Sequence, residues 1–420
     1  MRQITEAPEL VSSDFAFVPV PESRRVLGTN IFLTWIGFIL VVVSMSFGGG
    51  LAAQMDAVSF WVSVIVGNAV LAVCAFGAGY AGSVSGLTFG SLAARIFNKN
   101  GWRLAILYIP LTLIGWYAIE SSIFGNFVAD TFHLSDANRR IIMAGAAIFF
   151  SISAYIGVRF IGRVSYVLIP TVLAIAAFAL LRVDHAALAF GFNPPLISIW
   201  AGTAIVMSTW IFSALLVIPD LTRFVRSPLW AGIIGAGGVF VGNTLALGIG
   251  AFAAAYTKQS DPAMILVGLG YMPLALVLTF ASVWSTNDNN MYSSSLNVAR
   301  VLQLPRRSVV LALAFLGAVI ALFNPANIST MFAVLGFMGA SAPPLGGMVI
   351  GAYLFRGRGA PPSHSVIAPW LAWLVSTAVA FKLPSVAVVP GGLILGYVLW
   401  YVSNAVEYWF ISRYRVSAAE

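Results

Sequence analysis

Charged residues, cysteine and histidine are all scarce in this sequence. Asp, Glu, Lys and Arg together make up 9% of the 420 residues, against about 25% in an ordinary soluble domain. Cysteine occurs once, at Cys74, which excludes a disulfide framework and a cysteine-based metal site. The three histidines lie in separate polar stretches, at His133, His185 and His364, so a histidine metal cluster is not expected either. Residues 1–27 are polar and carry no apolar run, so we expect no signal peptide.

Apolar residues are correspondingly abundant, at 60% of the chain. They form long segments bounded by charge or by Pro and Gly, and about 20 apolar residues suffice to cross a bilayer as a helix. We therefore predict an all-α integral membrane protein with twelve transmembrane helices, at residues 28–52, 57–80, 104–129, 140–158, 164–181, 199–219, 229–256, 263–291, 308–324, 329–354, 366–381 and 389–411. The net charge of +8 does not indicate nucleic-acid binding, because the basic residues lie singly or in pairs between these segments.

The Lys and Arg residues are distributed unevenly between the two sides of the predicted membrane. Seventeen of the 22 fall on one side, and the other side holds Arg139, Arg140, Arg182, Lys258 and Lys382. Cytoplasmic loops of membrane proteins carry the excess of basic residues. We therefore predict that both termini are cytoplasmic, in a bacterial-type inner membrane, and we expect a monomer.

The first and sixth predicted helices both carry signals of an interrupted helix. The first contains Gly37 and the glycines at 48–50, and the sixth contains Ser208, Ser213 and Pro219. Interrupted helices at matching positions of two halves indicate a transport site near the bilayer midplane. Two units with an odd number of helices each would be inverted relative to one another. Gly and Pro are also common in membrane helices, so the pattern alone leaves both interpretations open.

Two acidic residues, Glu120 and Asp288, fall well inside predicted helices. A charge at that depth costs about 2.5–3.5 kcal/mol on insertion scales, so each must face a cavity, find a partner or be protonated. Trp116 and Glu120 are four residues apart and share one helix face. A flat heterocycle could stack on the ring while its N–H groups bond the carboxylate. The alternative is a structural Glu bonded to a neighbouring helix.

The most polar run in any predicted helix is 282–290, in the eighth, where seven of nine residues are polar. Ser285 and Thr286 offer adjacent hydroxyls that, with backbone carbonyls, suit a hard monovalent cation. Asn287, Asp288 and Asn290 offer groups for solute recognition or gating. Ser and Thr in membrane helices also bond their own i−4 carbonyls, and Asn bridges helices. Those roles account for one or two polar residues rather than for seven.

The sixth predicted helix places aromatic residues beside hydroxyls. Trp210 and Phe212 lie between Ser208 and Ser213, although ordinary packing would explain the same pattern. Asp220 closes this helix together with Arg223 and Arg226, and we interpret that group as a gate or a helix-end ion network.

Several motifs, in order along residues 20–355, carry a family resemblance. They are Pro21–Arg25, Gly48–Leu51, Gly115–Trp116, Pro219–Phe224, Trp284–Asn289 and Pro343–Gly347. Through them the chain resembles the nucleobase–cation symporter family, which includes the bacterial cytosine and hydantoin permeases, and the cytosine permease group is the most similar in pattern. The resemblance implies a five-plus-five inverted repeat, shared with sodium-coupled amino-acid transporters, and two additional C-terminal helices. The predicted parts are a tail at 1–27, repeats at 28–181 and 199–354 joined by an extracellular loop at 182–198, helices at 355–411 and a tail at 412–420.

The resemblance also implies the site residues. The sodium ligands would be backbone or hydroxyl oxygens of Gly37, Leu40, Ser282, Ser285 and Thr286. The substrate ring would lie between aromatic residues of the third and sixth helices, which gives Trp116 and either Trp210 or Phe212, and Asn287 matches a substrate-contacting amide. From the residues themselves we add Glu120 and Ser213 as substrate-binding candidates and Asp220, Arg223 and Asp288 as gating candidates.

Three positions depart from the family pattern. Leu113 stands where cytosine permease has Gln, and Glu120 stands where hydantoin-type members have Gln. An ionised carboxylate only accepts hydrogen bonds, so Glu120 should favour a solute with N–H donors. In the sixth helix an ungapped match puts Ile211 where an aromatic residue is expected, between Trp210 and Phe212.

Together these features predict a secondary active transporter that imports a nucleobase-like heterocycle by sodium symport. Cytosine, a related aminopyrimidine or purine, and hydroxymethylpyrimidine are the expected solutes. Proton coupling and a hydantoin- or allantoin-type ureide are the alternatives. We expect no cofactor beyond the coupling ion. We also predict no enzyme, because the predicted helices contain neither a nucleophile–base set nor clustered metal ligands.

Overall fold

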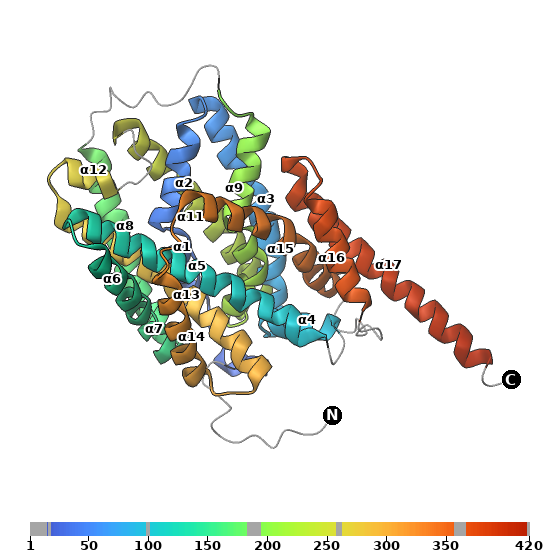
Figure 1. The fold of residues 1–420 in the computed structure, drawn as a ribbon. Coiled ribbons are helices and arrows are strands. Elements are labelled where there is room, and N and C mark those ends of the chain that lie inside the picture. The colour runs from blue at the N-terminus through green and yellow to red at the C-terminus, as the bar shows by residue number, and fades with distance from the viewer. Residues whose placement is uncertain are drawn as a thin grey trace.

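Helices make up the fold of the protein in a computed structural model that describes residues 15, 18–97, 101–182, 195–257, 263–356 and 367–417. Figure 1 shows them as a bundle from which the last helix projects. They are α1 Thr29–Ile39, α2 Val42–Ala52, α3 Ala57–Ser85, α4 Phe89–Ile96, α5 Trp102–Thr131, α6 Asp136–Phe150, α7 Ile152–Ile156, α8 Val158–Leu181, α9 Ile199–Leu216, α10 Ile218–Thr222, α11 Pro228–Thr257, α12 Ala263–Gly268, α13 Met272–Leu302, α14 Arg306–Ala321, α15 Ile328–Arg356, α16 Ala368–Ala380 and α17 Val388–Ser417. Most of the predicted loop 182–198, most of the N-terminal tail 1–27, and residues 418–420 of the C-terminal tail fall outside the described residues.

The described helices confirm an all-α membrane protein. Eight of them are long and apolar enough to cross a membrane, or up to ten if each of two bent helix pairs counts as one span. The pair α13 and α14 bends by 117°. These two helices are separated by Gln303, in the left-handed conformation with φ 56°, and by Pro305, which precedes α14. Each of the twelve predicted segments coincides with a helix or with a pair of consecutive helices.

The first predicted helix is broken into α1 and α2, which meet at 52°. The break falls at Leu40 and Val41, where the backbone leaves the helical conformation. The predicted interruption signals lie elsewhere, since Gly37 is within α1 and the glycines at 48–50 are within α2.

Gly48, together with Gly250 of α11, serves helix packing. A Cβ on Gly48 would lie 2.1 Å from the carbonyl oxygen of Leu247, and one on Gly250 would lie 1.6 Å from the carbonyl oxygen of Met45. Both distances are far inside van der Waals contact, so glycine at these positions lets α2 and α11 touch backbone to backbone. Small residues commonly allow such close crossings between membrane helices.

Three other predicted segments differ from the helices observed. The sixth is divided at Val217 into α9 and α10, and Pro219 lies in the first turn of α10, where a missing N–H costs nothing. The predicted single helix at 263–291 is wrong at its start, because Gly270, with φ 82°, separates α12 from α13. The short helix α4 was not predicted, although Thr88 caps it by accepting the N–H of Ser91.

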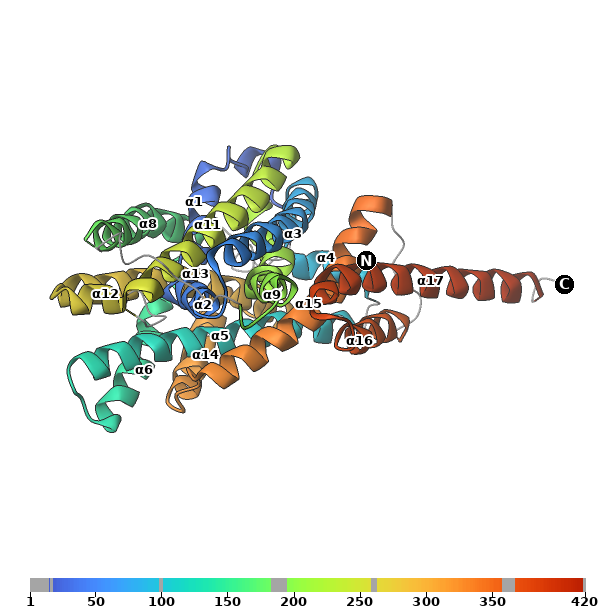
Figure 2. The same cartoon turned by 90° about the horizontal axis from the view of Figure 1, so that it is seen from above.

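Two groups of helices pack against each other. The first contains α2, α3, α9 and α11, and the second contains α5, α6, α8, α13 and α14. Helix α1 contacts both, through α11 on one side and through α8 and α13 on the other. Figure 2 shows α16 and α17 at one side of the molecule, where α17 packs along α15.

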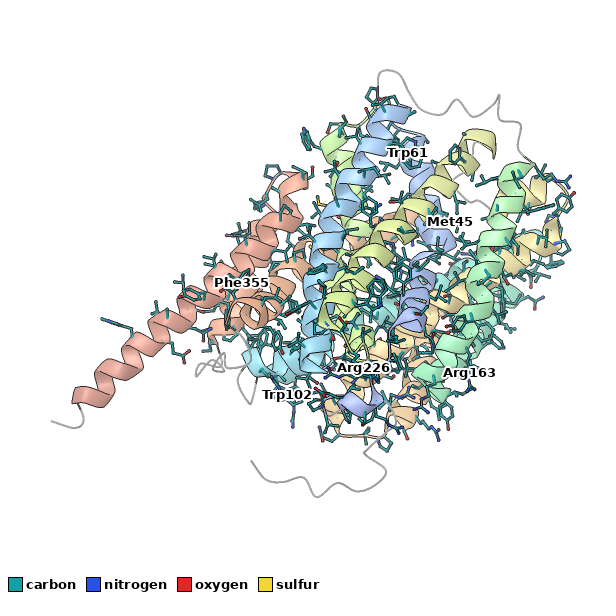
Figure 3. The ribbon with its side chains drawn as sticks, turned by 180° about the vertical axis from the view of Figure 1, so that it is seen from behind. Met45, Trp61, Trp102, Arg163, Arg226 and Phe355 are labelled. Carbon is teal, nitrogen blue, oxygen red and sulfur yellow. The ribbon has the colours of Figure 1, made fainter. Side chains whose placement is uncertain are left out.

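The two ends of the bundle differ in their side chains. Arg163, Arg226 and Trp102 lie toward one end, which we call the basic end, and Trp61 lies at the other (Figure 3). Met45, just beyond the break of the first segment, lies between these ends.

Candidate functional site

The broken first segment meets α13 at the polar run. The Thr286 hydroxyl donates to the carbonyl oxygen of Phe38 at 3.0 Å, and it also lies 3.2 Å from the carbonyl oxygen of Ser282. A Cβ on Gly37 would lie 2.7 Å from the Ser285 hydroxyl oxygen, so glycine lets this hydroxyl approach the backbone of α1. Helices far apart in sequence thus bring Gly37, Ser285 and Thr286 together.

The break in the first segment changes the hydrogen bonding of the backbone carbonyl groups near Ser285. The N–H of Val41 donates to the oxygen of Ile39, so it does not continue the helical ladder to the oxygen of Gly37. Leu40 ends α1 with ψ 65° and is 1% exposed. The Ser285 hydroxyl is buried and has no hydrogen-bond partner. The Ser282 hydroxyl bonds Thr279 within its own helix. Released carbonyls beside an unpaired hydroxyl form a set of neutral oxygen donors of the kind that a hard cation binds.

Trp116 and Glu120 are joined on one face of α5. The indole N–H of Trp116 donates to one carboxylate oxygen of Glu120 at 3.0 Å. Glu120 is 0% exposed, and its other carboxylate oxygen has no partner. Trp116 is only partly buried, and it packs on the hydrophobic cluster that contains Phe38 and Trp210.

The two aromatic residues of α9 point in different directions. The indole N–H of Trp210 donates to the Ser44 hydroxyl of α2 at 3.0 Å, and its ring lies 5.1 Å from that of Phe38 in an edge-on arrangement. Phe212 instead packs on Tyr108, with ring centroids 5.5 Å apart. Trp210 therefore faces the broken segment, whereas Phe212 faces a different side of α9. Residues two apart on a helix are not neighbours on its surface.

Asn287 bridges α13 and α5. Its amide nitrogen lies 3.2 Å from the Ser121 hydroxyl and 3.4 Å from the carbonyl oxygen of Tyr117. Its amide oxygen accepts from Asn290 at 3.3 Å. Tyr117 and Ser121 each follow Trp116 and Glu120 by one residue, so the stripe of α5 next to that pair contacts the polar run. Ser213, one turn beyond Thr209 on α9, is buried, and its carbonyl accepts the N–H of Val217 at the break between α9 and α10.

The three residues predicted to gate the site belong to two separate environments. One carboxylate oxygen of Asp220 accepts the N–H of Phe89 at 2.9 Å, at the start of α4. The guanidinium of Arg223 donates to the carbonyl oxygens of Asp220 and Phe15. Asp288 bonds the Ser153 hydroxyl, so it faces α7 and the group of helices around α5.

Several neighbours of the site were not predicted. They include the carbonyl of Phe38, the hydroxyls of Ser44 and Ser121, and a continuation of the buried polar run to Asn297. Spacing alone could have extended the run, because polar residues continue along α13 at 293, 294, 295 and 297. The partners on other helices leave no signal in the sequence. Among the described residues, no three His, Cys, Asp or Glu side chains are grouped so that they could hold a metal ion.

Comparison with known proteins gives a consistent result. The sequence profile described as permease for cytosine/purines, uracil, thiamine, allantoin matches residues 19–368. The cytosine permease of Escherichia coli K12 is 26% identical over 406 residues, covering 93% of this chain and 94% of the permease.

Solved structures show the fold. Mhp1, a nucleobase-cation-symport-1 family transporter solved in a closed conformation with bromovinylhydantoin bound, superposes with a TM-score of 0.78 at 17% identity, covering 95% of this chain and 96% of Mhp1. A Na+-coupled sialic acid symporter in its substrate-bound outward-open state has a TM-score of 0.68 at 12% identity, covering 91% of this chain and 90% of the symporter.

Proposed function

Because the chain belongs to the family of permeases for cytosine, purines, uracil, thiamine and allantoin, we propose that it carries a nucleobase-like heterocycle across the membrane together with a sodium ion. The family consists of transporters, so the prediction that the chain is not an enzyme is confirmed. The proposal for the solute rests on one observation above all, the half-satisfied carboxylate of Glu120 beside Trp116.

A buried carboxylate oxygen without a donor is costly, at about 1–3 kcal/mol or more for a charged group. The Trp116 N–H satisfies one oxygen of Glu120 and fixes its orientation, while the other oxygen is buried and has no partner. A ring that carries an amino group or a ring N–H supplies the missing donor. The same ring can stack on the partly buried face of Trp116. Cytosine, other aminopyrimidines, hydroxymethylpyrimidine and the donor edge of a purine all meet this requirement.

The cation proposal rests on the oxygen cluster at the break. We assign the sodium ligands to the carbonyl oxygens of Gly37, Leu40 and Ser282 and to the hydroxyls of Ser285 and Thr286. These groups are neutral, and the Ser285 hydroxyl lacks a partner of its own. The Thr286 bond to Phe38 already joins α13 to α1. An ion bound there would strengthen that junction and hold the broken segment in the shape that receives the solute.

A transporter built this way would work by alternating access. Trp210 faces the broken segment and would enclose the solute from the α9 side, and Asn287 would fix the α5 face against α13. Rocking of the two helix groups about α1 would then expose the site to each side in turn. Asp220 and Arg223, which join α10 to α4 and to Phe15, would hold the basic end closed. No cofactor other than the coupling ion is needed for this cycle.

We further propose that the basic end faces the cytoplasm of a bacterial cell and that the protein acts as a monomer. The uneven distribution of Lys and Arg supports this orientation. An epitope at the N-terminus should be reached by antibody in inside-out vesicles and not in right-side-out vesicles. The reverse accessibility would contradict the orientation, and cross-linking to a single dimer band at low protein density would contradict the monomer.

The second candidate is proton coupling, which the buried carboxylates favour. Glu120 and Asp288 are both 0% exposed and lie at positions where a proton could be carried. A hydantoin- or allantoin-type ureide is the second candidate for the solute, since such compounds also present N–H donors.

A binding screen tests the solute and the ion together. Thermal stability of the purified protein is measured with nucleobases, hydroxymethylpyrimidine, hydantoins and allantoin, each in sodium and in choline buffer. We expect an aminopyrimidine or a purine to raise the melting temperature, and to do so more in sodium. A response confined to ureides would replace the proposed solute, and equal responses in both buffers would remove the sodium assignment.

A further inference from the structure

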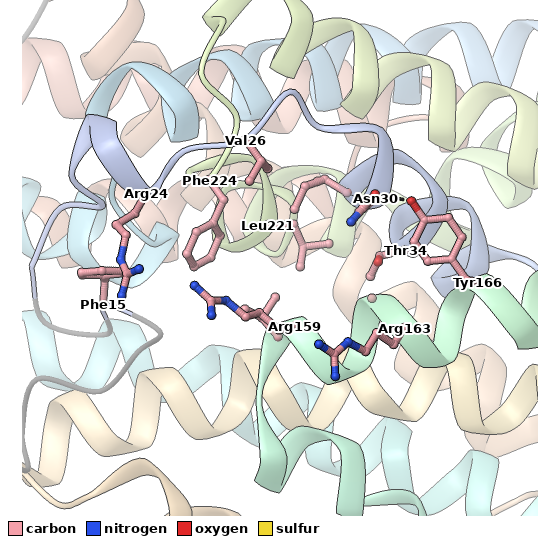
Figure 4. Close-up of a pocket in the computed structure, with 13 residues that line it drawn as sticks. Phe15, Arg24, Val26, Asn30, Thr34, Arg159, Arg163, Tyr166, Leu221 and Phe224 are labelled. Atoms are coloured by element: carbon pink, nitrogen blue, oxygen red, sulfur yellow. Dashed lines mark hydrogen bonds between the residues drawn. The ribbon is translucent and has the colours of Figure 1, made fainter.

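A cavity lies at the basic end, and neither Trp116 nor Glu120 lines it. It has a volume of about 290 Å³ and lies where η1 (Glu22–Arg24), the start of α1, the start of α8 and α10 come together (Figure 4). Its lining is formed by Phe15, Arg24, Val26, Asn30, Ile31, Thr34, Val158, Arg159, Gly162, Arg163, Tyr166, Leu221 and Phe224.

Among the residues that the structure describes, the charges that line this cavity all have one sign. Arg24, Arg159 and Arg163 line it, and none of its lining residues is acidic. Glu22 is on the same turn as Arg24, but it is exposed and does not line the cavity. The salt bridges formed within the described ranges are those of Arg139, on α6, so none neutralises these three guanidinium groups.

Two helix N-termini add to the positive potential. The cavity is lined by first-turn residues of α1, Asn30 and Ile31, and of α8, Val158 and Arg159. Both helices begin after a glycine, and neither has a side-chain cap on its first N–H groups. Uncapped N–H groups and the helix dipole together favour a bound anion.

Asn30 adds a neutral donor to these charges. Tyr166 donates its hydroxyl to the Asn30 amide oxygen, which leaves the amide nitrogen of Asn30 as a donor at the cavity. The cavity therefore combines guanidinium groups with backbone and amide donors, the combination found where proteins bind phosphate.

We propose that this cavity binds a phosphate group, held by Arg24, Arg159 and Arg163 between the N-termini of α1 and α8. The phosphate would belong either to a soluble compound or to a phospholipid headgroup. The apolar side chains of Leu27 and Val167, 77% and 66% exposed next to the lining residues, offer acyl chains a surface. The other end of α1 carries Gly37 and Leu40, so an anion bridging α1 to α8 would oppose their separation at the basic end. This site is independent of which solute and ion the protein carries.

A single-cysteine variant tests the site without any transport measurement. Cys74 is the only cysteine of the chain, so Cys74→Ser combined with Gly162→Cys places one thiol in the cavity wall. A Cβ at Gly162 meets nothing within 4 Å, so the new side chain fits. The readout is the ratio of maleimide labelling rates without and with the anion. It is measured in phosphatidylcholine nanodiscs with or without added pyrophosphate, and in nanodiscs that contain phosphatidylglycerol.

We expect pyrophosphate or phosphatidylglycerol to slow labelling at least threefold. Protection by pyrophosphate in neutral nanodiscs would identify a soluble ligand, and protection by phosphatidylglycerol alone would identify a lipid. The effect should disappear when Arg159→Gln and Arg163→Gln are added, and it should remain with Arg103→Gln, which removes an exposed arginine outside the lining. If the double variant fails to fold, Arg163→Gln alone takes its place, with the protection ratio reduced. No protection by either anion, or equal protection in the arginine variants, would overturn the proposal.

Discussion

The unpaired oxygen of Glu120 leads to a prediction about Glu120→Gln. Glutamine has nearly the same shape, and its amide oxygen can still accept the Trp116 N–H that is now 3.0 Å from the carboxylate. The second carboxylate oxygen, which has no partner in the protein, is then replaced by an NH2 group. A donor would face the donors of the solute, so the variant loses an attraction and gains a mismatch.

The size of the effect follows from the kind of bond that is lost. A hydrogen bond to a charged group contributes about 1.5–3 kcal/mol, and about 1.4 kcal/mol corresponds to a tenfold change in affinity. Glu120→Gln should therefore weaken binding of an aminopyrimidine roughly 10- to 100-fold. Solutes that present an acceptor at the same edge, such as uracil, should lose less or gain. The apparent affinity for sodium should change little, because the carboxylate is not among the proposed sodium ligands.

Binding of labelled cytosine to purified protein, titrated at fixed sodium and then with sodium varied, measures both quantities. Ser122→Ala is the matched control, since this hydroxyl lies on the same helix but bonds the carbonyl oxygen of Ala118, and we expect its affinities to stay near those of the wild type. If Glu120→Gln lowered the affinities for solute and sodium equally, or left cytosine binding unchanged, the assignment of Glu120 to the solute would be refuted.

Three further outcomes are expected. Ser285→Ala should raise the sodium concentration needed for half-maximal binding severalfold. Ser295→Ala, which removes a hydroxyl bonded within its own helix, should leave that concentration unchanged. Equal sodium titration curves for the two variants would contradict the cation assignment. Gly250→Ala should destabilise the protein by about 1–3 kcal/mol or more through overpacking, visible as a lower melting temperature, while Gly145→Ala meets open space and should be neutral. Trp210→Phe removes the indole N–H that bonds Ser44, a hydrogen bond worth about 0.5–1.5 kcal/mol that holds the ring against α2. With the ring less firmly placed, solute affinity should fall by up to about tenfold, and unchanged affinity would place the solute away from α9.

The sequence predicted the helices well, because apolar length and basic loops reflect the bilayer itself. It predicted the breaks poorly. The first segment breaks at Leu40 and Val41, two apolar residues, and the contact that meets the break comes from Thr286 on a distant helix. Gly48, one of the glycines that suggested a break, packs α2 against α11 instead. A glycine in a membrane helix can serve either purpose, and only the tertiary neighbours distinguish them.

In the candidate site, too, pairs within one helix could be predicted and contacts between helices could not. Trp116 and Glu120 could be paired from sequence because helical geometry fixes residues four apart. The choice between Trp210 and Phe212 could not be made in that way, since it depends on which face of α9 meets α1. Asp288 was grouped with Asp220 as a gating residue on grounds of charge, yet its partner, Ser153, lies on α7. A partner on another helix leaves no local pattern to read.

Uptake into proteoliposomes tests the central claim, cation-coupled carriage of a nucleobase-like solute, most directly. Labelled cytosine is supplied outside vesicles that have an inward sodium gradient and equal pH on both sides, and then outside vesicles with a proton gradient and no sodium. We predict concentrative uptake under the sodium gradient that collapses when sodium is equalised and is insensitive to a protonophore. Uptake that is independent of sodium and is abolished by the protonophore would contradict sodium coupling. The absence of uptake of any nucleobase under either gradient would contradict the proposed function.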